Sequence, residues 1–382
     1  MVVKGTNQTL KQLTMSLLKL KNGEKIYNKY VGSLAEDYLA EYSAHEIERD
    51  LLMCESLSRD SQYAIQIRLN DNRKNMWQIK LLKLGDMVSL SRGLPILENF
   101  GVKLQDERPY TIKIDGGDIV YICDFGVEVP VEYVDKIKDK QLLAKLEHAI
   151  VAVFDRKSEN DGLNRLVLFS GLEIREVEMM RAITHYIPQT TLPFSKVYLA
   201  DTLRAYPMIA HNLYAYFNAR FNIKLHSVEH AKQIRKEIVN ELEKVSSLDD
   251  DRILKAYLAV IDAMLRTNYY QLNNNKEHKS YISFKLESAK ISFLPKPLPL
   301  YEIFVYSMRF EAVHLRGGKV ARGGLRWSDR REDFRTEVLG LVKAQIVKNS
   351  VIIPTGSKGG FVCKKLPAIS NRDGYMTEGI NC

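Results

Sequence analysis

The segment from residue 321 to residue 361 reads "ARGGLRWSDRREDFRTEVLGLVKAQIVKNSVIIPTGSKGGF" and carries the most chemically suggestive residues of the chain. Apolar residues in its middle part recur at helical spacing, which predicts an amphipathic helix over residues 332–348. The apolar stretch "SVIIP" at residues 350–354 predicts a strand, and the glycines that follow predict a turn over residues 355–360. The segment therefore predicts a helix, a strand and a glycine-rich turn in direct succession.

Basic residues recur along the same segment, at Arg322, Arg326, Lys343, Lys348 and Lys358. Lys348 lies at the end of the predicted helix and Lys358 in the turn beyond the strand, so their ammonium groups can converge on one pocket. Two lysines beside a glycine-lined turn suit a small dicarboxylate. The alternative is a solvated charged surface, which is the usual environment of lysine.

Two glycine-rich patterns in this region have other interpretations. The run "RGGKVARGGLR" at residues 316–326 contains two RGG triplets, which in flexible segments bind single-stranded nucleic acid. Aliphatic residues interrupt this run and a helix follows it, so paired glycines that allow tight backbone turns are the better explanation. The stretch "TGSKGG" has the composition of a phosphate loop but lacks the spacing GxxxxGK[ST].

A third pattern lies outside this segment. His226, Glu229 and His230 spell HxxEH, in which two histidines hold a metal ion and the glutamate acts as a base. Ser227 is suited to cap the helix that follows, which would leave His226 outside that helix. The sequence therefore favours a solvated helix start over a metal site.

Residues 134–279 have a predominantly helical pattern. Gly171 is predicted to end one helix, and Pro207 to occupy the first position of another. Asp249 or Asp250 is predicted to cap a helix that continues to Gln271. After the polar turn "NNNKEHK" the pattern changes to strands, so a further domain is predicted to begin near residue 280.

Residues 61–133 combine strands with a helix, and residues 1–60 are helical, with Ser43 as a predicted cap. The order of elements in residues 61–133 resembles ACT-type regulatory modules. The whole chain is thus predicted to be a multi-domain α+β protein. The predicted elements of the ACT-like module are strands at residues 63–69 and 76–84, a helix that ends at Phe100 before Gly101, and strands at residues 110–114 and 118–127.

The composition fits an ordinary globular protein of two or three domains, with 382 residues, of which 45% are hydrophobic and 27% charged. The net charge of +9 attracts phosphates and carboxylates alike, so it does not distinguish nucleic acid from a small acidic ligand. The four cysteines lack CxxC spacing, which predicts free thiols. The sequence has neither a signal peptide nor a long apolar run, so the expected location is the cytoplasm.

Residues 322–361 closely resemble the start of the catalytic domain of the large-subunit, NAD-dependent glutamate dehydrogenases of bacteria. The upstream stretches "LQDERPY" and "LRTNYYQ" agree with the same family, so the resemblance covers essentially the whole chain. It implies oxidation of L-glutamate by NAD and water to 2-oxoglutarate, ammonium and NADH, in a homo-oligomer with no nucleic-acid or membrane partner. The implied domains are a helical lead-in at residues 1–60, an ACT-like α+β module at 61–133, a helical region at 134–279 and the start of an α/β substrate domain at 280–382.

The resemblance also implies roles for individual residues. Lys358 of "GSKGG" is the implied catalytic residue, and Lys348 of "QIVKNS" is implied to bind the α-carboxylate of glutamate. Arg322, with Gly323 and Gly324 beside it, takes the position at which the wider superfamily has a lysine that holds a substrate carboxylate. This is a departure, because a guanidinium can bind a carboxylate through two hydrogen bonds where an ammonium acts as a point charge.

The family binds NAD in a Rossmann domain, and this sequence contains no GxGxxG motif. Only 24 residues follow Lys358, so the sequence predicts an incomplete catalytic domain without activity by itself. Two alternatives stay open at this point. One is an amino-acid-sensing module without catalysis, and the other is an RGG-type RNA-binding protein.

Overall fold

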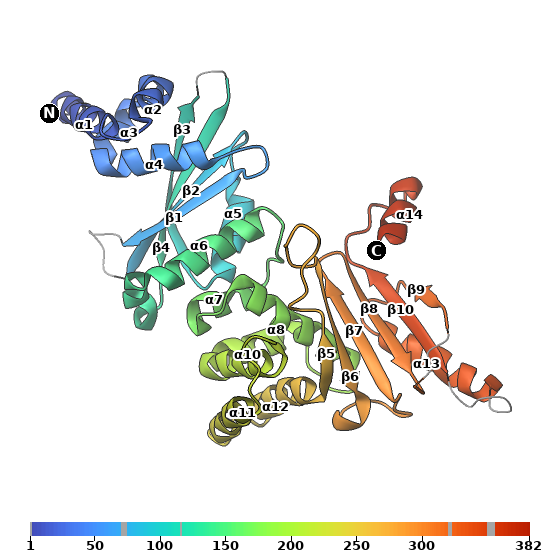
Figure 1. Ribbon diagram of the computed structural model, residues 1–382. Coiled ribbons are helices and arrows are strands. Elements are labelled where there is room, and N and C mark those ends of the chain that lie inside the picture. The colour runs from blue at the N-terminus through green and yellow to red at the C-terminus, as the bar shows by residue number, and fades with distance from the viewer. Residues whose placement is uncertain (1, 70–74, 115–116, 320–322, 350–355) are drawn as a thin grey trace. The chain divides into compact units, whose positions relative to one another are not determined.

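The computed structural model describes residues 2–69, 75–114, 117–319, 323–349 and 356–382 (Figure 1). The chain divides into two compact units, Met1–Ile174 and Arg175–Cys382. Both units contain helices and a sheet, which confirms the prediction of a multi-domain α+β protein. Within the described ranges, no helix is long and apolar enough to cross a membrane. The four cysteines are free thiols, as predicted.

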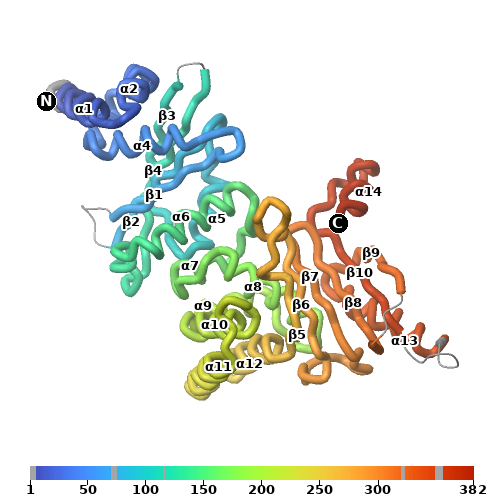
Figure 2. The backbone as a smooth tube through the Cα atoms, in the orientation of Figure 1, coloured from blue at the N-terminus to red at the C-terminus, as the bar shows by residue number. Residues whose placement is uncertain are grey.

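The first unit is built on a four-stranded antiparallel sheet with strand order β1-β2-β4-β3. Helices α1 to α4 pack on one face of this sheet, and α5 and α6 contact its strands as well (Figures 1 and 2). The elements are α1 (Val2–Leu17), α2 (Gly23–Tyr30), α3 (Glu36–Glu41), α4 (Ala44–Ser56), β1 (Tyr63–Leu69), β2 (Met76–Leu84), α5 (Leu90–Asn99), β3 (Lys103–Lys113), β4 (Ile119–Glu128), α6 (Lys140–Phe154) and α7 (Arg165–Ser170), with short 3-10 turns at Val31–Ser33, Val131–Lys138 and Gly162–Asn164.

The predicted strands of this unit are confirmed, with one difference. The third strand, β3, begins at Lys103 and not at Tyr110, because its residues pair with β4 along the whole length across a bulge between Leu104 and Asp106. Gly101, which follows α5, has the positive φ of +91° that the predicted helix end requires. Successive residues of a strand face opposite sides of the sheet, so Leu82 and Ile122 join the core under α1 and α4.

Ser43 caps α4 as the sequence predicts. Its hydroxyl accepts a hydrogen bond from the backbone N–H of Glu46, and the Glu46 carboxylate accepts one from the backbone N–H of Ser43. This reciprocal arrangement satisfies two backbone donors that the first turn of a helix leaves open.

We expect Ser43→Ala to lower the free energy of unfolding of the first unit by about 1 kcal/mol, the usual cost of a lost helix cap. Urea unfolding followed by far-UV circular dichroism measures it. Ser61→Ala is the matched control, because Ser61 lies in the loop after α4 and caps no helix. An equal loss in both variants would contradict a capping role.

The second unit joins a helical part to a six-stranded sheet with strand order β5-β6-β7-β8-β10-β9. Aromatic residues of β6 and β7 pack against Tyr186 at the end of α8. The elements are α8 (Ile174–Tyr186), α9 (Lys196–Ala205), α10 (Pro207–Phe221), α11 (Val228–Leu242), α12 (Leu248–Ala263), β5 (Met264–Thr267), β6 (Tyr281–Glu287), β7 (Tyr301–Ser307), β8 (Phe310–Arg316), β9 (Leu325–Trp327), α13 (Phe334–Asn349), β10 (Ser357–Cys363) and α14 (Arg372–Asn381), with 3-10 turns at Ile187–Gln189 and Ser288–Lys290.

Two predicted helix ends in the helical segment are confirmed. Gly171 ends α7 in the left-handed conformation with φ +69°, and Pro207 is the first residue of α10.

Two details of α12 correct the sequence-based prediction. The cap is Ser247, whose hydroxyl accepts a hydrogen bond from the backbone N–H of Asp250, and not Asp249 or Asp250. Both aspartates lie in the first turn, where a negative charge favours the positive end of the helix dipole. The helix stops at Ala263 and does not reach Gln271, because the chain from Met264 pairs with β6 as an edge strand.

Candidate active site

The predicted active-site segment folds as β9, α13 and β10 in succession (Figure 2). Strand β10 pairs in parallel with β9 and in antiparallel fashion with β8, so it is an inner strand of the sheet. Helix α13 connects the parallel strands and contacts β8 and β10. This helical connection is what parallel strands require, since they cannot be joined by a tight turn.

Lys358 lies in β10 and not in a turn, which corrects the prediction for residues 355–360. Ser357, Lys358, Gly359 and Gly360 are all strand residues, paired with β8. The strand predicted for residues 350–354 lies outside the described residues. The prediction of a turn was wrong because a glycine-rich stretch is usually a turn. Here the glycines allow close packing inside a sheet.

Close packing explains three of the glycines. A Cβ atom on Gly323 would lie 1.8 Å from the carbonyl oxygen of Ser357, and one on Gly360 would lie 2.5 Å from the Val338 side chain on α13. A Cβ on Gly359 would lie 2.4 Å from Leu325 on β9. None of these glycines is among the described residues with positive φ, so space and not backbone conformation requires them.

The site brings together Lys358, Gly323 and Gly324. The Lys358 side chain is half-buried and passes Gly323, where an added Cβ would lie 3.6 Å from Lys358 Cδ. Gly324 accepts a hydrogen bond from the backbone N–H of Gly359 through its carbonyl oxygen, at 3.2 Å. Among the residues that the structure describes, the Lys358 ammonium has no hydrogen-bonding or ion-pair partner.

The other two predicted substrate residues are Lys348 and Arg322. Lys348 lies in the last turn of α13 with an exposed side chain. Arg322 lies outside the described residues. Lys348 is one helical turn beyond Gln345, which contacts the start of β10.

Two residues that the sequence analysis missed fix the start of β10. The backbone N–H of Ser357 donates to the Gln345 side-chain oxygen at 2.9 Å, and Ser357 Oγ lies 3.0 Å from His314 Nε2 on β8. Ser357 is 1% exposed. No local pattern reveals these partners, because Gln345 and His314 come from different elements of the sheet and helix.

One buried ion pair and one partly exposed ion pair link α13 to the sheet. The Arg335 guanidinium, fully buried, donates through Nε to the Glu302 carboxylate on β7 at 3.0 Å, and Tyr186 donates to the same carboxylate at 2.9 Å. Burial opposes the charged guanidinium, but the hydrogen bonds to Glu302 hold the pKa of Arg335 above its ordinary value. In the first turn of α13, Glu337 forms an ion pair with Arg326 of β9.

The HxxEH pattern folds as the sequence analysis favours. Ser227 caps α11 through a 3.2 Å hydrogen bond from the backbone N–H of His230, which leaves His226 outside the helix. His226 Nδ1 contacts the carbonyl oxygen of Arg220 at 3.0 Å. His226, Glu229 and His230 all have exposed side chains, as expected for a solvated helix start.

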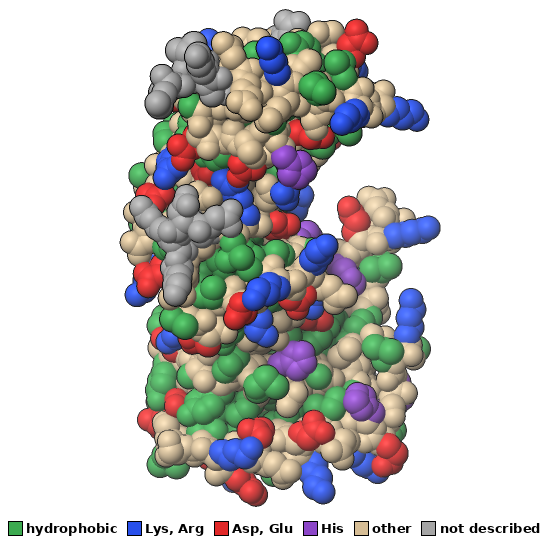
Figure 3. Space-filling view, turned by 90° about the vertical axis from the view of Figure 1, so that its left-hand side faces the viewer, with side chains coloured by type: hydrophobic (Ala, Val, Ile, Leu, Met, Phe, Trp, Pro, Cys, Tyr) green, Lys and Arg blue, Asp and Glu red, His purple; other side chains and the backbone are tan. Residues whose placement is uncertain are grey.

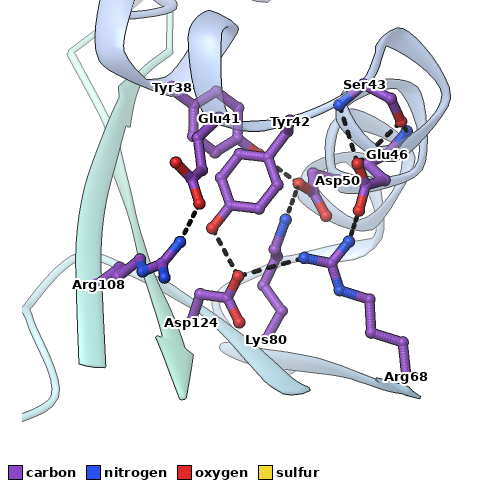
Figure 4. Close-up of polar contacts among 10 residues, drawn as sticks. All are labelled: Tyr38, Glu41, Tyr42, Ser43, Glu46, Asp50, Arg68, Lys80, Arg108 and Asp124. Carbon is purple, nitrogen blue, oxygen red and sulfur yellow. Dashed lines mark hydrogen bonds and ion pairs between the residues drawn. The ribbon is translucent and has the colours of Figure 1, made fainter. Parts of the chain in front are cut away.

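The first unit contains a second polar cluster, buried between α3, α4 and the sheet (Figure 4). Lys80 of β2 donates to the Asp50 carboxylate of α4 at 2.6 Å, and the Tyr38 hydroxyl of α3 donates to the same carboxylate. Asp50 is 0% exposed and Lys80 2% exposed. Burial raises the pKa of Asp50 and lowers that of Lys80, because both charged forms lose water.

The same cluster extends to β4 and β1. Asp124 lies opposite Lys80 in the β2–β4 pairing and accepts hydrogen bonds from Tyr42 and, at 3.4 Å, from Arg68. Arg68 also pairs with Glu46 of α4 (Figure 4). The Lys80 ammonium lies 3.6 Å from the centroid of the Tyr42 ring, a cation–π contact. The cluster thus ties the helical layer to the sheet through charge.

Comparison with known proteins identifies the family. Residues 237–382 match the model of the catalytic domain of bacterial NAD-glutamate dehydrogenase, residues 158–223 that of glutamate dehydrogenase helical motif 3, and residues 62–141 that of the glutamate dehydrogenase ACT3 domain. The chain is similar to proteins named NAD-specific glutamate dehydrogenase. It is 40% identical to that of Halomonas elongata, over 94% of this chain and 22% of the relative. It is 46% identical to that of Pseudomonas aeruginosa, over 79% of this chain and 19% of the relative.

A third relative of the same name, from Mycobacterium tuberculosis, is 35% identical over 92% of this chain and 22% of its own length. The chain thus spans about a fifth of the length of the curated relatives it matches. The three family models follow the same order as the ACT-like, helical and catalytic segments predicted from the sequence. The chain therefore belongs to the NAD-specific glutamate dehydrogenase family of bacteria.

Proposed function

We propose that this chain supplies the glutamate-binding segment and the catalytic lysine of an NAD-dependent glutamate dehydrogenase. The reaction is L-glutamate with NAD and water to 2-oxoglutarate, ammonium and NADH. One observation carries the proposal: the Lys358 ammonium has no partner among the described residues, and its side chain lies beside Gly323, within the segment that matches the catalytic domain. An unpaired, half-buried ammonium is suited to a substrate carboxylate or to proton transfer.

In this proposal Lys358 is catalytic, and Lys348 and Arg322 bind the substrate carboxylates. Gly323 and Gly324 are the substrate-binding glycines of the proposal, and Gly323 must stay a glycine because a Cβ there would lie 1.8 Å from the carbonyl oxygen of Ser357. Glutamate and 2-oxoglutarate each carry two carboxylates, so a site with several basic groups suits them. Lys358 holds or gives up a proton at Nζ while the basic neighbours orient the dicarboxylate.

The residues present do not fit NAD. The sequence contains no GxGxxG motif, and the described sheet has a single parallel pair, β9 with β10, where a dinucleotide fold needs several parallel strands. We therefore assign no NAD contact to this chain and derive no hydride-transfer step from it. NAD belongs to the proposal for the whole enzyme.

The domain boundaries at residues 60, 133 and 279, the homo-oligomeric state and the cytoplasmic location are also part of the proposal. The free thiols of Cys54, Cys123, Cys363 and Cys382 support a reducing compartment.

Isothermal titration of the 382-residue chain with 2-oxoglutarate tests the proposed function. We expect binding, and we expect Lys358→Ala to weaken it at least about tenfold, since hydrogen bonds to charged groups contribute roughly 1.5–3 kcal/mol. Lys236→Ala is the matched control, because Lys236 is an exposed lysine of α11 in the same unit. No heat of binding for 2-oxoglutarate or glutamate would overturn the proposed function.

Titration of the same chain with other ligands separates the alternatives. An amino-acid-sensing module would bind another amino acid, and Lys358→Ala would not change the Kd for that amino acid. An RNA-binding protein would bind single-stranded RNA at low salt and lose it as salt rises. On the face drawn in Figure 3, basic and acidic side chains are interspersed, whereas RNA binding favours a clustered basic surface. We therefore favour the dehydrogenase.

A further inference from the structure

His314 of β8 lies next to the strand that carries Lys358. In the antiparallel pairing of β8 with β10, His314 is opposite Gly359 and Leu315 is opposite Lys358. Because residues of a strand alternate between faces, Ser357, Gly359 and His314 share one face and Lys358 projects from the other. Ser357 directly precedes Lys358 in β10. The contacts that fix Ser357 therefore also fix the direction in which the Lys358 side chain projects from the sheet.

Ser357 is held on three sides. Its backbone N–H bonds to Gln345, its hydroxyl lies 3.0 Å from His314 Nε2, and its carbonyl oxygen lies so close to Gly323 that no Cβ fits between them. The first and third contacts involve the Ser357 backbone. His314 is the one described partner that holds the Ser357 side chain.

The His314 ring has a buried polar atom that packing alone does not require. Its Nδ1 is buried and has no partner among the described residues. A buried polar atom without a hydrogen bond costs stability, which an apolar side chain of similar shape would avoid. Burial, and then the positive charge of Arg316, lower the pKa of His314, so the ring is neutral at pH 7.

We propose that His314 is a positioning residue for Lys358, acting through its contact with Ser357. The inference rests on the proposed function, since it takes Lys358 to be the group that meets the dicarboxylate. The neutral imidazole holds the Ser357 hydroxyl, Ser357 fixes the first residue of β10, and Lys358 is thereby directed past Gly323. Protonation of His314 weakens this arrangement, because a second positive charge then lies beside Arg316.

Arg316, two residues along β8, is the charged group that acts on His314. The neighbours of His314 across the sheet are uncharged: Ile303 on β7 and Gly359 on β10, with Leu325 of β9 paired to Gly359. Lys285 of β6 lies in register with Ile303 on the same face and interacts electrostatically with Arg316. Within the described ranges, the pH response of the site is therefore expected to follow His314, with Arg316 as the charge that acts on it most directly.

The test is titration of the 382-residue chain and its variants with 2-oxoglutarate between pH 5.5 and pH 8. We expect His314→Ala to raise Kd about fivefold at pH 7.5, the factor that the loss of one ordinary hydrogen bond gives. His314→Asn, which keeps a polar group for Ser357, is expected to stay within about twofold of the unchanged chain. Because the pKa of His314 is lowered, Kd of the unchanged chain is expected to rise only at pH values below the ordinary histidine pKa of about 6.5, and Kd of His314→Asn is expected to stay flat.

A double-variant cycle makes the assignment specific. If His314 acts through Ser357, the double variant with both His314→Ala and Ser357→Ala has a Kd no higher than that of either single variant. Thermal unfolding of each variant separates loss of folding from loss of positioning. Equal Kd values for His314→Ala and the unchanged chain, or a pH response that survives in His314→Asn, would overturn the positioning role and leave the proposed function intact. A chain that does not bind 2-oxoglutarate at all overturns both.

Discussion

Replacing Lys358 with alanine is expected to lower kcat for glutamate oxidation by about 10²- to 10⁴-fold in the whole enzyme, the range that one positioned acid–base group contributes. The physical reason is that the Lys358 ammonium is unpaired among the described residues and that its side chain lies beside Gly323. The measurement is NADH absorbance at saturating glutamate and NAD. Lys348→Ala is expected to act mainly on KM, since an exposed residue at the end of α13 is suited to carboxylate binding.

Two controls make this result interpretable. Lys236→Ala removes an exposed lysine from α11 and is expected to leave kcat unchanged. Lys358→Arg keeps the positive charge but cannot give up its proton, so it is expected to retain part of the binding and little of the turnover. Turnover of Lys358→Ala within threefold of the unchanged enzyme would remove Lys358 from the chemistry.

Asp50→Ala is expected to lower the free energy of unfolding of the first unit by about 3–5 kcal/mol, as measured when one partner of a buried ion pair is removed. The change leaves the Lys80 ammonium buried without its acceptor, and the Tyr38 hydroxyl loses the same acceptor. Trp77 lies at 0% exposure in this unit. Its fluorescence in a Trp327→Phe background therefore reports unfolding of the first unit alone, because the chain has two tryptophans.

Asp86→Ala is the matched control for Asp50→Ala. Its carboxylate is 96% exposed and pairs with Lys83 at 3.8 Å, so the expected loss is below about 1 kcal/mol. The double change Asp50→Leu with Lys80→Met is expected to recover much of the loss, since apolar replacement of both partners leaves no buried charge unpaired. A loss below about 1 kcal/mol for Asp50→Ala would mean that water reaches the cluster.

The candidate site was only partly predictable from the sequence. The resemblance pointed to Lys358, Gly323 and Gly324, and the structure brings these three together. The local pattern predicted the wrong structure at Lys358, because a run of glycines is typical of a turn and Lys358 lies in β10. The partners of Ser357 gave no signal, since Ser357 and His314 are 43 residues apart and no motif joins them.

Local features of the fold were determined by the sequence itself. The cap at Ser43, the strand at Tyr63–Leu69 and the left-handed Gly171 each depend on a few neighbouring residues, so periodicity and capping rules suffice to find them. The tertiary structure alone decided that the helix of Leu248–Ala263 gives way to a strand, that Lys358 lies in an inner strand and that Lys80 meets Asp50. Each of these depends on partners distant in sequence, 30 residues away for Lys80 and Asp50. Pairing across a sheet and burial of charge are set by which elements meet in space, and a local pattern carries no information about that.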